Sequence, residues 1–180
     1  MNVINDILDM SSIENGKLEL NMEAISVQEH ISRMEEMFRL GMEQRKLHFE
    51  VIRDVKSDYV YGDYLRLTQI ITNLLSNAMK FTRPGGTVTF RIVDRPAALE
   101  HMVDFEIHVR DTGIGMSEEF QKRLFQTFER EKNTTMSGVS GTGLGLSIAH
   151  NLAELMGGTL TCSSTLGVGT EFIFSFTAKT

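Results

Sequence analysis

Two asparagines and a lysine stand at helical spacing in the segment "TNLLSNAMKF", residues 72–81. Each helical residue advances by about 100°, so Asn73, Asn77 and Lys80 lie within roughly 60° of one another, beside an apolar stripe. Amide oxygens can ligate a hard cation such as Mg²⁺, and a lysine ammonium can meet phosphate oxygens. The pattern is compatible with a site for metal-bound phosphate and with a solvated helix edge, because asparagine is a common residue, so a second signal is needed to separate the two.

A single aspartate ends an alternating apolar and polar run. Asp111 closes "VDFEIHVRD" and is followed by Thr112, Gly113, Ile114 and Gly115. A carboxylate acceptor would thus lie beside glycine backbone, which a ligand can approach closely because glycine has no side chain. The alternative is an ordinary turn.

The glycine-rich segment "GTGLGL", residues 141–146, opens a predicted helix. Free N–H groups at a helix N-terminus form a natural phosphate site. The segment is not the six-residue dinucleotide fingerprint, and the chain has no phosphate-loop motif ending in Gly-Lys-Ser/Thr. The related segment "GVGT", residues 167–170, precedes the last predicted strand and also fits a simple hairpin turn.

Hydrophobic periodicity predicts the elements that position these residues. Apolar residues at helical spacing, with Ser26 and Asp63 as caps, predict helices at 2–14, 26–45, 63–81 and over about a dozen residues after "GTGLGL". Alternating runs predict strands at 47–54, 87–93, 103–111, 159–165 and 170–178. We expect the second and third of these strands to be antiparallel neighbours and the last two to form a hairpin.

The composition limits the classes of partner and compartment. The chain has 180 residues, 41% hydrophobic and 23% charged, which suits one α/β domain. Its net charge of −6 argues against a nucleic acid partner. One cysteine, Cys162, and five scattered histidines offer neither an internal disulfide nor metal spacing, which fits a reducing compartment. Neither a membrane span nor a signal peptide is recognisable, so the piece is expected to be soluble.

In order and spacing, the segments "NLLSNAMKF", "DTGIGM", "LFQTFER", "GTGLGL" and "GTEF" resemble the N, G1, F, G2 and G3 boxes of the sensor histidine kinase ATP-binding domain. The superfamily also contains gyrase, MutL-type repair ATPases and heat-shock chaperone ATPases. The resemblance covers about residues 20 to 178, and the ordered set is far more specific than any single box. The preceding "INDILDMSSIENGKLEL" is similar to the end of the dimerisation hairpin of such kinases, especially hybrid ones.

The resemblance implies the α+β Bergerat ATP-binding fold, a two-layer α/β sandwich with about three helices on a mixed sheet of about five strands. It also implies a domain division. Residues 1–18 would be the C-terminal end of the dimerisation-hairpin helix, and residues 19–180 would be the catalytic ATP-binding domain. A lid would span about residues 116–142, a stretch that is glycine-rich at both ends and charged in the middle.

ATP and Mg²⁺ are the cofactors that the resemblance implies. Asn77 would ligate Mg²⁺, while Asn73 and Lys80 would line the phosphates. Asp111 would accept the adenine amino group, and Thr170 would reach the same side of the base. Other residues would shape the base pocket (Gly113, Gly115 and Met116) or wrap the phosphates (Gly141, Thr142, Gly143, Leu144, Gly145 and Leu146).

For two further pairs of residues, the resemblance implies a role in the site, but an ordinary structural role is also compatible with the sequence. Phe125 and Phe128 match the F box, whose rings anchor the lid, but they also fit core positions on a short amphipathic helix. Arg130 and Lys132 would contact the γ-phosphate, although a solvated charge run is the stronger interpretation.

Asn73 separates the branches of the superfamily. Gyrase-like and chaperone ATPases carry a glutamate there as the base that activates water, and an amide cannot take a proton in this way. We therefore expect the chain to bind ATP, hydrolyse it poorly, and leave the γ-phosphoryl for a histidine. The alternatives are an ATP hydrolase of the gyrase and chaperone branch and a degenerate, non-catalytic interaction module.

The acceptor histidine itself is missing from the sequence. None of the five histidines has the surroundings of the family's acceptor (His30, His48, His101, His108 and His150). The expected partners are therefore a dimerisation domain that carries the phosphoacceptor histidine and, downstream, a response regulator receiver domain. This piece would be a monomeric cytoplasmic domain of a homodimeric parent, with anchoring of the parent in the inner (plasma) membrane left open.

Overall fold

The computed structural model describes residues 3–126 and 143–180. The helices are α1 (Val3–Glu14), α2 (Val27–Gln44), α3 (Tyr64–Phe81), α4 (Glu118–Gln121) and α6 (Gly145–Leu155). The strands are β1 (Glu23–Ser26), β2 (His48–Asp54), β3 (Tyr59–Gly62), β4 (Thr87–Pro96), β5 (Met102–Asp111), β6 (Thr159–Thr165) and β7 (Gly169–Lys179).

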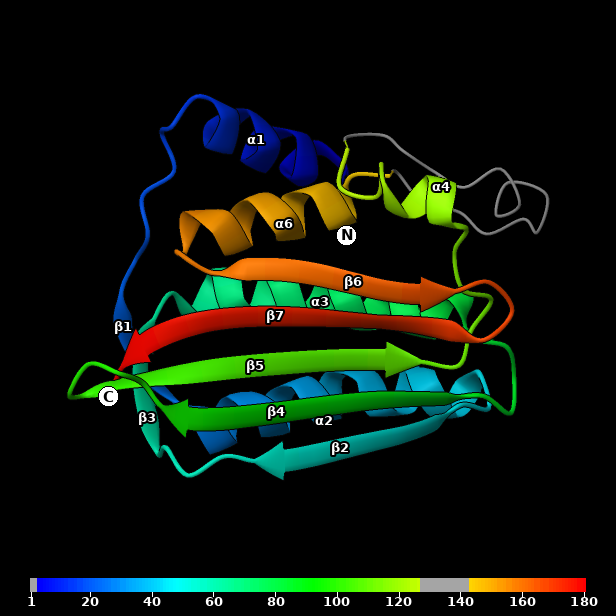
Figure 1. The fold of residues 1–180 in the computed structure, drawn as a ribbon, viewed down its shortest axis with the longest axis horizontal. Coiled ribbons are helices and arrows are strands. Elements are labelled where there is room, and N and C mark those ends of the chain that lie inside the picture. Colours follow the sequence, from blue (N-terminus) through cyan, green and yellow to red (C-terminus); the bar gives the residue numbers. More distant parts are fainter. Residues whose placement is uncertain (1–2, 127–142) are drawn as a thin grey trace.

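The strands form one mixed sheet, and the helices form a layer behind it (Figure 1). The order is β1-β3-β7-β5-β4-β2, and β6 pairs with β7 beside this path. Strands β2 and β4 are parallel, and the other pairs are antiparallel. Helices α2, α3 and α6 are the three predicted helices of the second layer, with α1 packed on the outside of α6. The predicted α+β sandwich is confirmed.

The sheet is larger than predicted, with seven strands among the described residues rather than about five. The two additional strands, β1 and β3, have four residues each. Runs this short carry almost no alternation signal, and their pairing is set by contacts that the local sequence does not encode. They pair with each other, and β3 reaches the rest of the sheet through Tyr61 opposite Lys179.

Side-chain caps fix where the two long helices begin. The Ser26 hydroxyl accepts the Glu29 N–H at 3.5 Å at the start of α2, as predicted. The Glu29 carboxylate pairs with Arg33 at 2.5 Å. Asp63 caps α3 by accepting the Arg66 N–H at 3.0 Å, and its second oxygen accepts the Asn21 N–H at 2.9 Å. Asp63 therefore ties the start of α3 to the segment before β1.

The hydrophobic core lies between the sheet and the helices. Phe90, Val109 and Phe172 lie side by side in register on β4, β5 and β7, and their side chains are buried in the core that the helices cover. The opposite face of the sheet is polar: the His108 ring lies 3.2 Å from a Glu171 oxygen. This alternation explains why the long strands could be recognised by period two.

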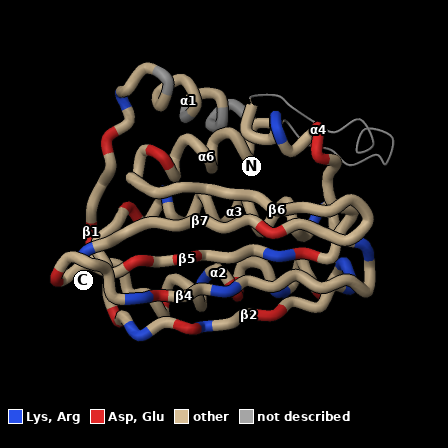
Figure 2. The backbone as a smooth tube through the Cα atoms, viewed as in Figure 1, with Lys and Arg blue, Asp and Glu red and all other residues tan. Residues whose placement is uncertain are grey.

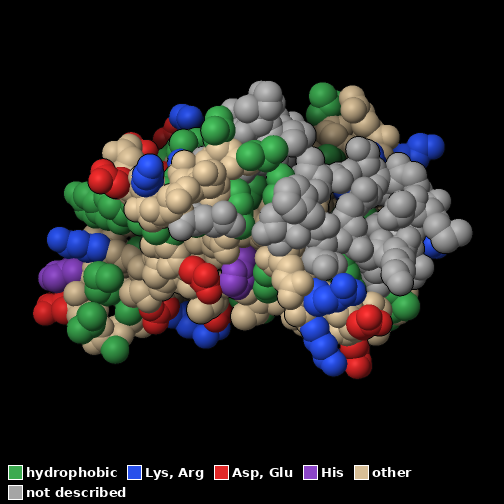
Figure 3. All heavy atoms as spheres, turned by 90° about the horizontal axis from the view of Figure 1, so that it is seen from above, with side chains coloured by type: hydrophobic (Ala, Val, Ile, Leu, Met, Phe, Trp, Pro, Cys, Tyr) green, Lys and Arg blue, Asp and Glu red, His purple; other side chains and the backbone are tan. Residues whose placement is uncertain are grey.

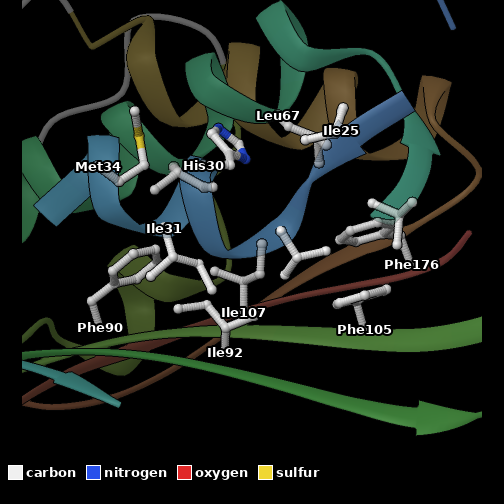
Figure 4. A pocket seen from close by; sticks show the side chains of 13 residues that line it. Ile25, His30, Ile31, Met34, Leu67, Phe90, Ile92, Phe105, Ile107 and Phe176 are labelled. Carbon is white, nitrogen blue, oxygen red and sulfur yellow. The ribbon is translucent and has the colours of Figure 1, made fainter. Parts of the chain in front are cut away.

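A small cavity of about 30 Å³ lies in this core between α2, α3 and the sheet. Figure 4 shows its lining, which is apolar except for His30. The His30 Nε2 lies 3.0 Å from the Thr68 hydroxyl, and the ring packs against Tyr64. Burial lowers the pKa of His30 to about 4, with the charge of Arg33 as a smaller cause. A neutral, hydrogen-bonded histidine in a gap of this size marks a packing void.

Charges of both signs are distributed over the surface. Lys and Arg alternate with Asp and Glu along β2, β4 and β5 (Figure 2). Figure 3, seen from above, has charged side chains of both signs around the rim of the face beside the grey atoms. Among the described helices, none combines the length and the apolar character that crossing a membrane requires.

Candidate functional site

Asp111 lies at the end of β5, between Val88 on β4 and Thr170 on β7. Its side chain is 7% exposed, and its Oδ1 accepts the Gly113 N–H at 2.8 Å. Burial raises the pKa of Asp111 to about 6, while the backbone N–H groups of Gly113 and Thr170 favour the ionised form. The predicted position at a strand end is confirmed, and at pH 7 the carboxylate is a fixed, buried acceptor.

Glycines pack three backbone segments together around Asp111. A Cβ on Gly115, whose φ is 66°, would lie 2.0 Å from the Thr165 carbonyl oxygen. A Cβ on Gly169 would lie 2.0 Å from the Asp111 carbonyl oxygen. The sequence predicts that glycine after Asp111 lets a ligand approach closely, and the structure gives a second reason for it, the close contact of the loop after β5 with the β6–β7 turn.

Ser164 on β6 contacts this candidate site, although no sequence motif points to it. Its Oγ accepts the Met116 N–H at 2.9 Å, donates to the Gly169 carbonyl at 3.0 Å, and lies 2.8 Å from Thr170 Oγ1. The available signal was the alternation of "TLTCSST", which places Ser164 on the same face as the buried Leu160. Cys162 shares that face, and burial raises the pKa of its thiol to about 12.

The polar edge of α3 faces the N-terminus of α6. Asn73 is 3% exposed, and its Nδ2 has no hydrogen-bond partner among the residues that the structure describes. A Cβ on Gly145, the first residue of α6, would lie 3.2 Å from Asn73 Oδ1. Asn77 and Lys80 follow one and two turns later and are half-buried, and the Lys80 Nζ lies 4.9 Å from the Phe81 ring centroid. An unpaired buried amide costs about 1–3 kcal/mol, so Asn73 fits a place where a ligand accepts its N–H.

Helix α6 begins at the predicted glycine-rich segment. Gly143 has a φ of 74°, the N-cap residue Leu144 is buried, and no described side chain caps the first turn. The N–H groups of Gly145 and Leu146 therefore lie at a helix start without a side-chain acceptor in the described part of the chain. Gly141 and Thr142 lie outside the described residues, so their predicted contacts with phosphate stay predictions.

Helix α4 connects the start of the predicted lid to the strand ends around Asp111. The Gln121 amide donates to the Met116 carbonyl at 3.1 Å and to the Ser164 carbonyl at 3.0 Å. Phe125 stacks on His150 of α6 with ring centroids 4.4 Å apart. The other lid residues of the prediction lie outside the described part of the chain (Phe128, Arg130 and Lys132).

The side chains of the site suit a magnesium ion that is held mainly by the phosphates of a bound substrate and by water. In the described parts of the chain, no group of three or more His, Cys, Asp or Glu side chains could hold a metal. Mg²⁺ needs no such group, because it keeps several waters and is bound through one or two protein oxygens plus substrate phosphates. A single amide oxygen from Asn77 is compatible with that mode of binding.

Comparison with known proteins agrees with this geometry. Residues 62–180 match the family of histidine kinase-, DNA gyrase B-, and HSP90-like ATPases. The chain is 39% identical over 177 residues to the sensor histidine kinase GacS of Pseudomonas protegens, covering 97% of this chain and 19% of the relative. It is 39% identical to the circadian input-output histidine kinase CikA of Synechococcus elongatus, covering 96% and 22%. The chain thus spans about a fifth of the length of these relatives.

A solved structure gives the same result for the fold. Full-length ShkA in complex with AMPPNP superimposes with a TM-score of 0.78 at 26% identity, covering 98% of this chain and 35% of that one. The family match spans more than half of the chain and includes α3, Asp111 and the start of α6. The chain belongs to the histidine kinase-, DNA gyrase B-, and HSP90-like ATPase family.

Proposed function

We propose that the chain is the ATP-binding catalytic domain of a two-component sensor histidine kinase. The observation that carries the proposal is Asn73, a buried amide whose N–H has no partner among the described residues, beside the start of α6, which no described side chain caps. An N–H donor and helix N-terminal amides suit phosphate oxygens. An amide at this position cannot act as the base that activates water.

The adenine end of the site would be built around Asp111. Its buried carboxylate would accept the amino group of the base, and Thr170 lies beside it in the sheet register. Gly113, Gly115 and Met116 would form the adjoining wall. The AMPPNP bound by the structural relative ShkA supports a nucleotide of this class.

Magnesium would be held by Asn77 together with the phosphates. When bound, the ion supplies positive charge at the oxygens of the transferring group. Asn73 and Lys80 would position those phosphates, and the first N–H groups of α6 would add partial positive charge. In this arrangement the chain contributes positioning and electrostatic stabilisation.

The γ-phosphoryl would pass to a histidine on a dimerisation domain and from there to a receiver domain. The first step is supported by the relatives GacS and CikA, which are named as histidine kinases, and the second by the resemblance to hybrid kinases. The parent would be a homodimer with this domain in the cytoplasm, and residues 1–18 would continue from its dimerisation helix. In the structure, α1 packs on α6 and the Asn151 amide donates to the Met10 sulfur at 3.4 Å.

Labelled ATP tests the transfer directly. The chain is incubated with ATP labelled at the γ-phosphate and Mg²⁺, with and without a separate dimerisation hairpin that carries an acceptor histidine. We expect slow phosphate release alone and acid-labile label on the hairpin histidine when it is present. Rapid phosphate release without the hairpin would place the chain in the hydrolase branch, and absence of ATP binding would leave only an interaction module.

The role of Asn77 has its own test. Asn77→Ala is expected to remove the Mg²⁺ dependence of ATP affinity, because the amide oxygen is the only protein ligand assigned to the ion. Calorimetric titration with ATP, with Mg²⁺ and with a chelator, measures that dependence. Ser76→Ala, at the neighbouring position of α3, is the control and should retain it. If Asn77→Ala also retains it, another residue ligates the ion.

A further inference from the structure

We infer that Ser164 sets the base preference of the site by fixing the Thr170 hydroxyl as a hydrogen-bond acceptor, so that the pocket takes a 6-aminopurine and rejects a 6-ketopurine. The inference rests on the proposed nucleotide-binding function. In it, Ser164 is a positioning residue that acts through Thr170. It is carried by three distances around one hydroxyl group.

The three neighbours of Ser164 Oγ leave only one arrangement that makes all three hydrogen bonds. A hydroxyl has one hydrogen to donate and two lone pairs. The Met116 N–H, at 2.9 Å, can only donate to it, and the Gly169 carbonyl, at 3.0 Å, can only accept from it. The remaining neighbour, Thr170 Oγ1 at 2.8 Å, must therefore donate to the second lone pair of Ser164. The hydrogen of Thr170 is thereby used within the protein.

The consequence is that Asp111 and Thr170 both present lone pairs at this end of the sheet. Thr170 lies directly opposite Asp111 in the β5–β7 register, and both side chains are buried on the inner face of the sheet. Asp111 offers carboxylate oxygens, and Thr170 offers the lone pairs of a hydroxyl whose hydrogen points to Ser164. An exocyclic amino group donates to these lone pairs, whereas a keto oxygen would face acceptors without a hydrogen between them.

The backbone around Ser164 prevents the hydrogen bonds from rearranging. Gln121 donates to the Ser164 carbonyl at 3.0 Å and to the Met116 carbonyl at 3.1 Å, which holds these two residues together. On the other side, Gly169 is packed so closely that a Cβ would lie 2.0 Å from the Asp111 carbonyl oxygen. The Ser164 hydroxyl is thus fixed relative to both Met116 and Gly169. Its donor and acceptor roles therefore stay the same, and Thr170 must donate its hydrogen to Ser164.

Two nucleotides that differ at the 6-position test the inference. The chain is titrated calorimetrically with ATP and with inosine triphosphate, which carries a keto oxygen in place of the amino group. We expect the wild type to favour ATP. Ser164→Ala should lower the ratio of the two affinities about tenfold, because the freed Thr170 hydroxyl can donate to the keto oxygen.

Two serine variants separate this role from a structural one. Ser163→Ala changes the adjacent residue on the exposed face of β6 and should leave the ratio unchanged. Ser164→Thr keeps the hydroxyl and should restore most of the discrimination. If Ser164→Ala weakens both nucleotides equally, its role is structural and the inference is overturned, although ATP binding by the wild type would leave the proposed function intact.

Thr170→Val keeps the inference testable if Ser164→Ala does not fold. It removes the hydroxyl whose orientation is at issue, so the preference for ATP over inosine triphosphate should fall. An unchanged ratio in this variant would overturn the inference. A wild type that binds neither nucleotide would overturn the inference and the proposed function together.

Discussion

Helix α3 separates two regions that bury their residues in different ways. On the side of α2, the core is apolar, and its buried histidine, His30, is hydrogen-bonded to Thr68. On the side of α6 and the strand ends, the structure buries Asn73, Asp111 and Thr170. Of these, Asn73 has an amide without a described partner, and Asp111 has a pKa raised by burial. The first region contributes stability, whereas burial of polar groups in the second costs stability, which fits the proposal that these groups meet a ligand.

This difference predicts which substitutions change folding and which change binding. A core residue should alter the free energy of unfolding and leave the nucleotide affinity of the folded protein alone. A polar residue of the site should do the reverse. The predictions below run from the largest expected effect to the smallest.

Phe90→Ala tests the apolar region. Phe90 is fully buried between the sheet and the helices and lines the small cavity. Truncation should lower the free energy of unfolding by about 3–5 kcal/mol, because it removes apolar contacts and enlarges a void. Denaturant titration measures this loss, and calorimetry at low temperature should find unchanged ATP affinity. A loss below about 1 kcal/mol would contradict the assignment of this region as the stability core.

Gly115→Ala tests the close packing of the site. The new Cβ would meet the Thr165 carbonyl, and the φ of 66° disfavours any side chain, so we expect a loss of roughly 3 kcal/mol together with a loss of ATP affinity. The matched control is Gly167→Ala, which has a φ of 80° but open space around its Cβ. It should cost only about 1 kcal/mol of backbone strain. Equal losses in the two variants would show that contact with Thr165 has no special role.

Asp111→Asn should separate stability from binding. Because burial raises the folded-state pKa of Asp111 above its unfolded value, ionisation at pH 7 opposes folding. Removing the charge should leave the free energy of unfolding unchanged or raise it by on the order of 1 kcal/mol. ATP affinity should fall at least about tenfold with the loss of the acceptor. An unchanged affinity would remove Asp111 from the base-binding site.

The pH dependence of binding should give a smaller effect. With a pKa of about 6, Asp111 is mostly ionised at pH 7.5 and mostly protonated at pH 5. ATP affinity of the wild type should therefore decline as pH falls through about 6. The protonation of ATP also changes with pH. Dividing the affinity of the wild type by the affinity of Asp111→Asn at each pH removes this contribution. A ratio that stays constant between pH 5 and 7.5 would mean that Asp111 ionisation does not support binding.

Local signals predicted the long elements. The caps at Ser26 and Asp63 mark the starts of α2 and α3. The alternation of apolar and polar residues predicts β5 and its end at Asp111. These signals are local, because a cap or a period is complete within a few residues. Strands β1 and β3 escaped prediction because a four-residue strand is stabilised by pairing partners distant in the chain.

The residues of the candidate site also fall into two groups: local sequence signals predict some of them, and contacts between distant parts of the chain position the others. Helical spacing already placed Asn73, Asn77 and Lys80 on one edge of α3, and the structure confirms that edge. Ser164 could not be found in this way, because its role depends on the β6–β7 register and on the approach of Met116, 48 residues earlier in the chain. The same holds for the unpartnered amide of Asn73, which becomes visible only once α6 is packed against α3.

Calorimetric titration of the wild-type chain with ATP, in the presence of Mg²⁺, tests the central claim most directly. The polar region is expected to bind one nucleotide per chain with saturable heat, and the phosphate released from the same sample should stay low. Absence of saturable binding would contradict the claim that Asp111 and Asn73 are buried in order to meet an adenine nucleotide.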